Sequence, residues 1–204
     1  MFLTELQQDA LRETVNVGVG YAASALSELV GSPVTLQVPE LVVLTMGEAQ
    51  DYVSGLGTGN KAAVRLAFSG ALTGSIVLMF PLDAAVALVS LLAHDLDVNP
   101  DMDGLRAATL EETGNLILNG VVGSLSNMLH EQVAVSIPYY TEQPGFPERM
   151  VDAGAPVPAH VILARAQFNV EAREIRGEIF LFFETGSVDT LTTALDRAVS
   201  SLED

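Results

Sequence analysis

The sequence contains an internal repeat, and this duplication constrains the fold more than any other feature of the 204 residues. Residues 13–39 align without a gap with residues 112–138, at an offset of 99, and seven of these 27 positions are identical. The similarity returns at an offset of 103, where Gly74–Phe80 parallels Gly177–Phe183. We therefore expect a single domain over residues 1–204, built from two repeats of about 1–98 and 99–204 that pack as pseudo-symmetric halves.

The first repeat reads as a long helix, three strands and a second helix. Thr4, with Gln7 three residues later, forms a capping-box pattern, and apolar residues recur behind it at helical spacing, which predicts a helix over about 4–30. Alternating residues over 34–38 predict a strand that stops at Pro39. Two strands at about 63–69 and 74–80 and a helix over about 83–92 complete the unit.

The second repeat follows the same order. We expect a helix over about 103–130, strands near 132–137, 160–170 and 176–183, and a closing helix over about 187–202. Residues 141–158 are rich in Pro, Gly and acidic residues and read as a long loop. The order α-β-β-β-α, found twice without regular β-α-β alternation, favours an α+β fold with a mostly antiparallel sheet flanked by the two long helices.

Composition narrows the range of functions. The formal net charge is −17 and the pI is near 4.3, so we expect neither nucleic acid nor membrane partners, because phosphate backbones and anionic lipids would be repelled. Solubility in general, or a salty cytoplasm, could each account for the acidity. The apolar runs are shorter than the roughly 18–20 residues of a membrane span, and the N-terminus has no basic signal region, which favours a cytoplasmic location. The absence of cysteine excludes disulfides and thiolate chemistry.

Two other patterns are weak signals. Gly18–Ala23 matches the G-x-G-x-x-A pattern of dinucleotide-binding turns, but a charged helical segment precedes it where that motif needs a strand. The three histidines are scattered singly, and no carboxylates stand at a convincing metal-ligand spacing, so we expect no metal site.

Polar residues in the first long helix are predicted to lie opposite its apolar stripe. A helical wheel places Asp9, Glu13, Asn16 and Gly20 together on that outward side. Any surface helix shows a polar face, so one such stripe is weak evidence of function.

The second long helix repeats the arrangement. Glu112 and Asn115 take the places of the glutamate and the asparagine, Asn119 takes the place of the glycine, and Ala108 that of the aspartate. Because outward Glu and Asn are retained in both copies while core positions differ, we interpret the two pairs as functional.

The two motifs resemble a known signature. The spacing Asp9-x3-Glu13-x2-Asn16-x22-Pro39, met again as Glu112-x2-Asn115-x22-Pro138, is similar to that of the CheC-type chemotaxis phosphatases, the CheC/CheX/FliY family. The resemblance covers essentially the whole chain. One departure is Ala108, where the family usually has Asp or Ser.

The resemblance implies hydrolysis of the aspartyl phosphate of the chemotaxis response regulator CheY. By this analogy Asn16 and Asn115 are catalytic and hold the attacking water in line with phosphorus, while Glu13 and Glu112 clamp the partner by pairing with a cationic side chain. Such a transition state is loose, so positioning matters more than a strong base.

Further expectations follow from the same resemblance. Asp9, Gly20 and Asn119 are supporting or contact residues, and the prolines end their strands. The protein carries no cofactor of its own, and Mg²⁺ comes with the bound response regulator. The alternative is a non-catalytic binding or regulatory module for the phosphorylated response regulator and the receptor deamidase CheD. A FliY-like switch role is disfavoured, because that type has an additional C-terminal domain. We expect a monomer, since the second repeat can bury what a single repeat would pair with in a dimer.

Overall fold

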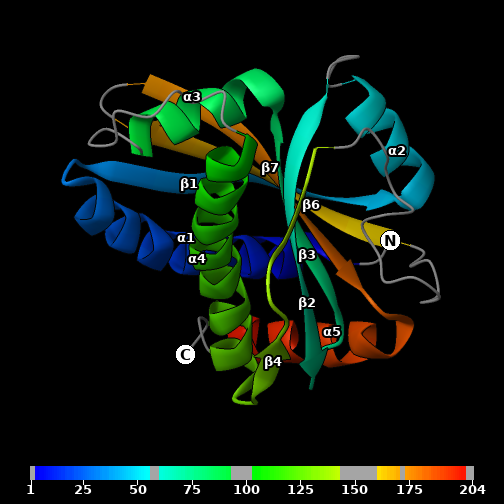
Figure 1. The fold of residues 1–204 in the computed structure, drawn as a ribbon. Helices are drawn as coiled ribbons and strands as arrows, with labels where there is room; N and C mark the ends of the chain where they lie inside the picture. The colour runs from blue at the N-terminus through cyan, green and yellow to red at the C-terminus, as the bar shows by residue number, and fades with distance from the viewer. Residues whose placement is uncertain (1–2, 56–59, 93–102, 143–159, 171–172, 201–204) are drawn as a thin grey trace.

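The structure is a computed structural model that describes residues 3–55, 60–92, 103–142, 160–170 and 173–200 (Figure 1). Its elements, in chain order, are α1 (Glu5–Val30), β1 (Val34–Thr45), α2 (Met46–Gly55), β2 (Lys61–Gly70), β3 (Gly74–Pro81), α3 (Leu82–Leu92), α4 (Asp103–Leu129), β4 (Val133–Val135), β5 (Tyr139–Thr141), β6 (His160–Val170), β7 (Arg173–Phe183) and α5 (Thr185–Ser200). The expected α+β class is confirmed.

Within the described residues, seven antiparallel strands form one sheet in the order β1-β6-β7-β3-β2-β4, and β5 also pairs with β2. The two strands that follow the long helices, β1 and β4, lie at opposite edges. Each of them pairs with a strand from the other half of the chain, β1 with β6 and β4 with β2. The halves therefore exchange edge strands, and their superposition as pseudo-symmetric units stays a prediction.

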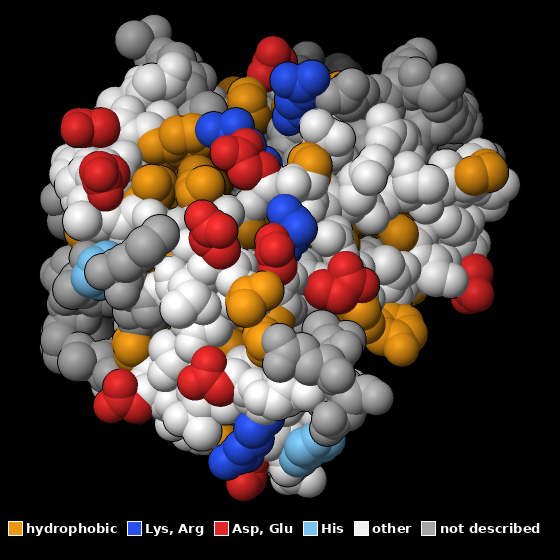
Figure 2. All heavy atoms as spheres, turned by 180° about the vertical axis from the view of Figure 1, so that it is seen from behind, with side chains coloured by type: hydrophobic (Ala, Val, Ile, Leu, Met, Phe, Trp, Pro, Cys, Tyr) orange, Lys and Arg blue, Asp and Glu red, His pale blue; other side chains and the backbone are white. Residues whose placement is uncertain are grey.

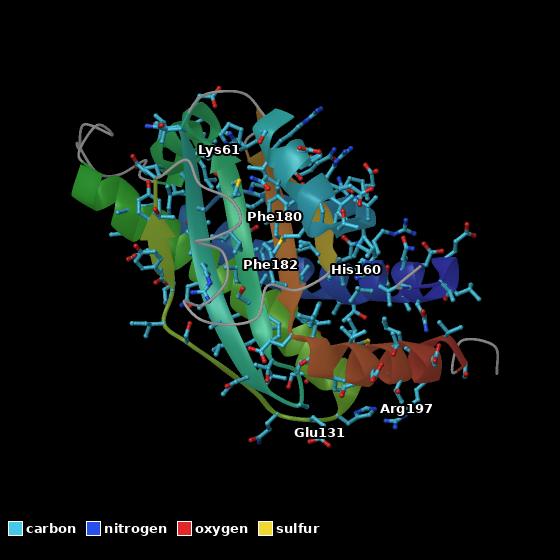
Figure 3. The ribbon with its side chains drawn as sticks, turned by 90° about the vertical axis from the view of Figure 1, so that its right-hand side faces the viewer. Lys61, Glu131, His160, Phe180, Phe182 and Arg197 are labelled. Carbon is cyan, nitrogen blue, oxygen red and sulfur yellow. The ribbon has the colours of Figure 1, made fainter. Side chains whose placement is uncertain are left out.

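The sheet is buried on both faces. Along β7, Ile179 and Leu181 face the larger core, which α1, α3, α4 and α5 cover. Phe180 and Phe182 alternate with them and face a smaller core, to which α2 contributes (Figure 3). A strand buried on both sides is expected to be nearly continuously apolar, as β7 is from Ile179 to Phe183.

The long helices α1 and α4 cross on the larger core (Figure 1). Gly18 and Gly120 meet at the crossing, where a Cβ on Gly18 would come within 2.5 Å of the Gly120 carbonyl oxygen. A Cβ on Gly120 would come within 2.4 Å of the Gly18 carbonyl oxygen. Only glycine lets the two backbones approach so closely. This contact fixes where the outward faces of the two helices lie relative to each other.

Local signals explain the ends of α1. Thr4 is the N-cap, its side chain accepts from the Gln7 N–H, and the Gln7 side chain accepts from the Thr4 N–H at 2.8 Å, as the capping-box pattern predicts. Gly31 ends the helix in the left-handed conformation at φ 66°. None of the helices in the described ranges combines the length and hydropathy required to span a bilayer.

Three expectations need correction. The strand after α1 does not stop at Pro39 but continues to Thr45, with an irregularity between Gln37 and Glu40 that accommodates the proline. The helix α2 and the short strand β5 were not predicted. The expected loop over 141–158 begins inside β5, and residues 143–159 lie outside the described ranges.

Candidate functional site

The first predicted pair lies on α1, within about one and a half turns before Gly18 at the crossing with α4. Glu13 is exposed, as the helical wheel predicts, and Asn16 is half-buried. The Nδ2 of Asn16 donates to the Val38 carbonyl oxygen at 3.2 Å, and its Oδ1 accepts from the Val38 N–H at 2.7 Å. Asn16 therefore holds β1 through both ends of its amide group.

The irregularity in β1 explains why Val38 takes such a partner. The register with β6 shifts between Gln37 and Glu40, so Val38 and Pro39 have no cross-strand partner. Val38 is 1% exposed, and buried backbone groups without hydrogen bonds are costly. The amide of Asn16 satisfies both backbone groups of Val38, which gives the Asn-x22-Pro spacing a structural role in the first copy.

The supporting residues of α1 remain on the surface. Asp9 is exposed and pairs with Arg12, with 2.9 Å between Oδ1 and Nη2. Gly20 is exposed, and a Cβ there would meet nothing within 4 Å.

The second predicted pair lies on α4 and has different partners. Glu112 is exposed and Asn115 is half-buried. The Nδ2 of Asn119 donates to the Oδ1 of Asn115 at 2.7 Å and to its main-chain oxygen at 2.8 Å. Ile137, the counterpart of Val38, is 87% exposed, and among the described residues no hydrogen bond joins it to Asn115.

Close packing fixes α4 beside this pair. Gly114 lies directly over Val64 of β2, where a Cβ would approach the Val64 side chain within 2.6 Å. On the next strand, the Tyr140 N–H donates to the Oε1 of Glu111 at 3.3 Å. The helix thus sits on β2 and β5, and Ala108 at its start is exposed.

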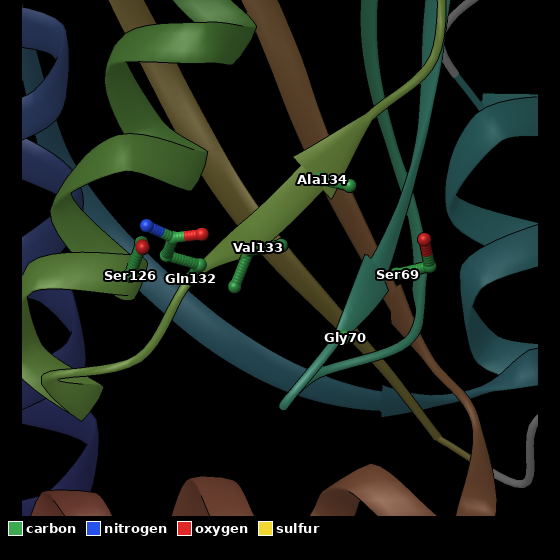
Figure 4. A pocket seen from close by; sticks show the side chains of 6 residues that line it. All are labelled: Ser69, Gly70, Ser126, Gln132, Val133 and Ala134. Carbon is green, nitrogen blue, oxygen red and sulfur yellow. The ribbon is translucent and has the colours of Figure 1, made fainter.

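Neither pair lines either of two hollows formed by described residues. An open hollow of about 470 Å³ lies where β2 and β4 meet the end of α4, and Figure 4 shows its lining residues Ser69, Gly70, Ser126, Gln132, Val133 and Ala134. A second, of about 380 Å³, lies between the end of α4 and α5. Within the described parts of the chain, no three His, Asp or Glu side chains gather as a metal site.

A polar cluster on the opposite face of the sheet was not predicted. Tyr52 of α2 donates to Glu178 at 2.8 Å, and Arg165 lies over the Tyr52 ring, 5.4 Å from its centroid. Arg165 also pairs with Glu40 at 2.6 Å. Figure 2 shows acidic and basic side chains interleaved on this face. The capping-box pattern Thr45-x-x-Glu48 is the sequence signal that could have predicted the helix α2, which carries Tyr52.

Chemically, an exposed carboxylate and an amide one turn apart can pair with a cation and hold a water molecule. Because both pairs stand on helix surfaces, they suit a macromolecular partner better than an enclosed small molecule.

No family model matches the chain. Among curated proteins, the chain is 29% identical over 143 residues to the CheY-P phosphatase CheC of Bacillus subtilis (strain 168), an alignment that covers 67% of the chain and 66% of CheC. It is 21% identical over 174 residues to the flagellar motor switch phosphatase FliY of the same organism, which covers 85% of the chain and 44% of FliY. The chain therefore matches less than two thirds of the length of either relative.

Solved structures share the fold. Thermotoga maritima FliY superposes with a TM-score of 0.75 at 18% identity, over 97% of this chain and all of that one. A CheX–CheY–BeF3–Mg²⁺ complex from Borrelia burgdorferi gives a TM-score of 0.51 at 15% identity, over 85% of this chain and 99% of the matched one. The chain is thus similar in sequence to CheC and FliY, and it shares its fold with FliY and CheX.

Proposed function

We propose that the protein hydrolyses the aspartyl phosphate of a CheY-like response regulator. The observation that carries the proposal is the pair on α4, where exposed Glu112 stands one turn from Asn115. Among the described residues, none accepts a hydrogen bond from the Nδ2 of Asn115. Support also comes from the similarity to CheC, a CheY-P phosphatase in Bacillus subtilis.

The chemistry fits these residue types. Phosphoryl transfer passes through a loose transition state, so a catalyst acts mainly by positioning and charge stabilisation. The Asn115 amide offers a donor and an acceptor lone pair, which can hold a water in line with the phosphorus of the bound partner. Glu112 pairs with a cationic side chain of the partner and fixes the insertion of α4 beside the phosphate. The pair Glu13 and Asn16 is the second predicted site.

Exposed apolar side chains flank both pairs. Val17 and Tyr21 follow on the outward side of α1 and are 45% and 68% exposed. Ile137 and Tyr139 lie in the segment from β4 to β5 beside α4 and are 87% and 62% exposed. Large apolar and aromatic side chains around a polar centre are typical of protein interfaces. They provide contact area for a folded partner.

The metal of this reaction belongs to the partner. Charge on the phosphoryl oxygens requires neutralisation, and Mg²⁺ bound to the response regulator supplies it. The CheX–CheY complex of known structure contains Mg²⁺ together with CheY. The partners in this proposal are the phosphorylated response regulator and the deamidase CheD, and the protein acts as a cytoplasmic monomer.

The double variant Asn16→Ala/Asn115→Ala tests the proposal. Phosphorylated response regulator is mixed with wild-type or variant protein in Mg²⁺, and the loss of the acyl phosphate is timed. Removing the amide of each site is expected to lower the stimulated rate by about 100-fold or more. Asn127→Ala removes an exposed asparagine near the end of α4, about 120° around the helix from Asn115, and serves as the matched control, with wild-type activity expected.

The variants are compared per folded molecule, because loss of the two bonds to Val38 is expected to cost about 1–3 kcal/mol of stability. Circular dichroism at the assay temperature gives the folded fraction. Equal phosphate release by the wild type and the folded double variant would exclude these asparagines as catalytic residues.

A further inference from the structure

The two asparagines of the repeated motif have different hydrogen-bond partners, and the two copies differ at the position one helical turn after the asparagine. One helical turn after Asn115 stands Asn119, and one turn after Asn16 stands Gly20. The amide of Asn115 is held by its neighbour on α4, whereas the amide of Asn16 is held by the backbone of Val38.

The contact between Asn119 and Asn115 fixes an orientation. The Nδ2 of Asn119 donates at 2.8 Å to the main-chain oxygen of Asn115, a common contact for a polar side chain in a helix. It also donates at 2.7 Å to the side-chain Oδ1 of Asn115. The second bond distinguishes the two ends of the Asn115 amide, because a donor can bind its oxygen and not its nitrogen.

We propose that Asn119 is a positioning residue, which turns the Asn115 amide so that Nδ2 and the second lone pair of Oδ1 face the site. The proposal deepens the proposed phosphatase function and rests on it. A preorganised amide needs no reorientation when the water is bound, and misplacement of a reacting group by about 1 Å can lower a rate by about 100-fold.

The first copy lacks this device. Gly20 has no side chain, so the amide of Asn16 is free to turn toward β1 and bind Val38. There it supports the irregularity in β1 that Pro39 introduces. In the second copy, the counterpart Ile137 is exposed and does not bind Asn115, so the amide of Asn115 remains available to the partner. The repeat has therefore diverged into a structural asparagine on α1 and a positioned one on α4.

The kinetic test uses Asn119→Ala in the full chain with phosphorylated response regulator. We expect kcat to fall about 10- to 100-fold with KM nearly unchanged, because Glu112 still holds the partner. Asn119→Gln keeps an amide donor at the same i+4 position and is expected to recover most of the lost kcat. Asn127→Ala, on the same helix, is the matched control and should keep the wild-type kcat.

Activity results separate the two proposals. If Asn115→Ala lowers kcat and Asn119→Ala leaves it within about twofold of wild type, the positioning role is wrong and the phosphatase stands. If KM rises in Asn119→Ala while kcat is kept, Asn119 contacts the partner instead, which also overturns the proposal. If the wild type does not speed phosphate loss at all, the phosphatase fails and the positioning role fails with it.

Amide hydrogen exchange tests the structural half without activity. The Val38 amide is expected to exchange slowly in the wild type and much faster in Asn16→Ala, because its acceptor is lost. The Ile137 amide should exchange at the same rate in the wild type and in Asn115→Ala. Unchanged protection of the Val38 amide in a folded Asn16→Ala variant would contradict the structural role of Asn16, which is to bind the backbone of Val38.

Discussion

Glu178 is a carboxylate on β7, directly before the apolar run from Ile179 to Phe183. It lies between Arg165 of β6 and Met79 of β3 in the register of the sheet, and its Oε2 is buried with no hydrogen-bond partner. Burial raises the pKa of Glu178, and the hydrogen bond from Tyr52 and the charge of Arg165 offset this in part. Burial, with the bond to Glu178, also raises the pKa of Tyr52 to about 12.

The raised pKa predicts how Glu178→Gln changes the pH dependence of stability. The folded protein retains the Glu178 proton above the ordinary pKa of 4.5, whereas the unfolded chain releases it there. The folded state thus binds more protons in that window, and this carboxyl lowers the stability as pH rises. We expect the melting temperature of Glu178→Gln, relative to wild type, to increase from about pH 4 to pH 7.

Glu48 provides a control of opposite sign. The Thr45 backbone N–H and the Thr45 hydroxyl donate to its carboxylate, which lowers its pKa. Its contribution to stability is therefore present above the ordinary pKa and is lost as pH falls. Glu48→Gln should lose stability relative to wild type as pH rises over the same range. Parallel trends for the two variants would contradict this account of the cluster.

Among single residues, the exposure of the two glutamates was predicted correctly, whereas the two asparagines, predicted to be exposed, are half-buried and hydrogen-bonded. The period of the helix alone predicts that Glu13 and Glu112 point outward, because the face on which a helical residue lies is set by its spacing from the apolar residues nearby in the sequence. The bond from Asn16 to Val38 depends on the irregularity in β1, and the bond from Asn119 to Asn115 on the rotamers of α4. Such contacts are set by tertiary packing, which one sequence does not display.

At the scale of elements, the crossing of α1 and α4 predicts a sharp difference between two glycines of the same helix. Gly18→Ala forces a methyl group against the backbone of Gly120 and is expected to cost about 1–3 kcal/mol, read from chemical denaturation. Gly20→Ala meets open space and should stabilise the helix by up to about 1 kcal/mol.

Both substitutions raise helix propensity equally, so the difference between them isolates the crossing. Equal stabilisation by Gly18→Ala and Gly20→Ala would show that the two backbones do not touch as described.

The two long helices were predicted nearly to their ends, whereas the short elements α2 and β5 were missed. A capping box, a C-terminal glycine and an apolar period define α1 locally, and an apolar period defines α4, so their bounds follow from sequence. The strand β1 runs through Pro39 because an edge strand can absorb a proline at a bulge, which the rule for strand ends does not anticipate. The helix α2 is only 10 residues long and has two buried residues, Ala49 and Val53, so its apolar period spans few turns.

For the whole molecule, the net charge of −17 implies self-repulsion that salt screens. We expect the melting temperature to rise between about 0.05 M and 1 M NaCl, by about 2–4 °C for each kcal/mol of repulsion removed. A combined variant with Glu28→Gln, Asp51→Asn and Asp189→Asn, all at exposed positions, should show a smaller rise. A melting temperature that is flat or falls with NaCl would contradict a repulsive surface.

The duplicated sequence anticipated the antiparallel sheet but not the exchange of its edges. Pairing of β1 with β6 and of β4 with β2 links residues far apart in the chain. Each half thereby completes the edge of the other. The bonding of Asn16 depends on this exchange, since Val38 lies on one exchanged strand.

The most direct measurement of the central claim is multiple turnover. A small amount of the protein is added to a large excess of phosphorylated response regulator in Mg²⁺, and released phosphate is counted per molecule of protein. The account predicts many phosphates released for each wild-type molecule, and close to the partner's own rate of loss when both Asn16 and Asn115 are replaced by alanine. Release that never exceeds one phosphate per protein, or a phosphorylated partner that is bound and preserved, would contradict it.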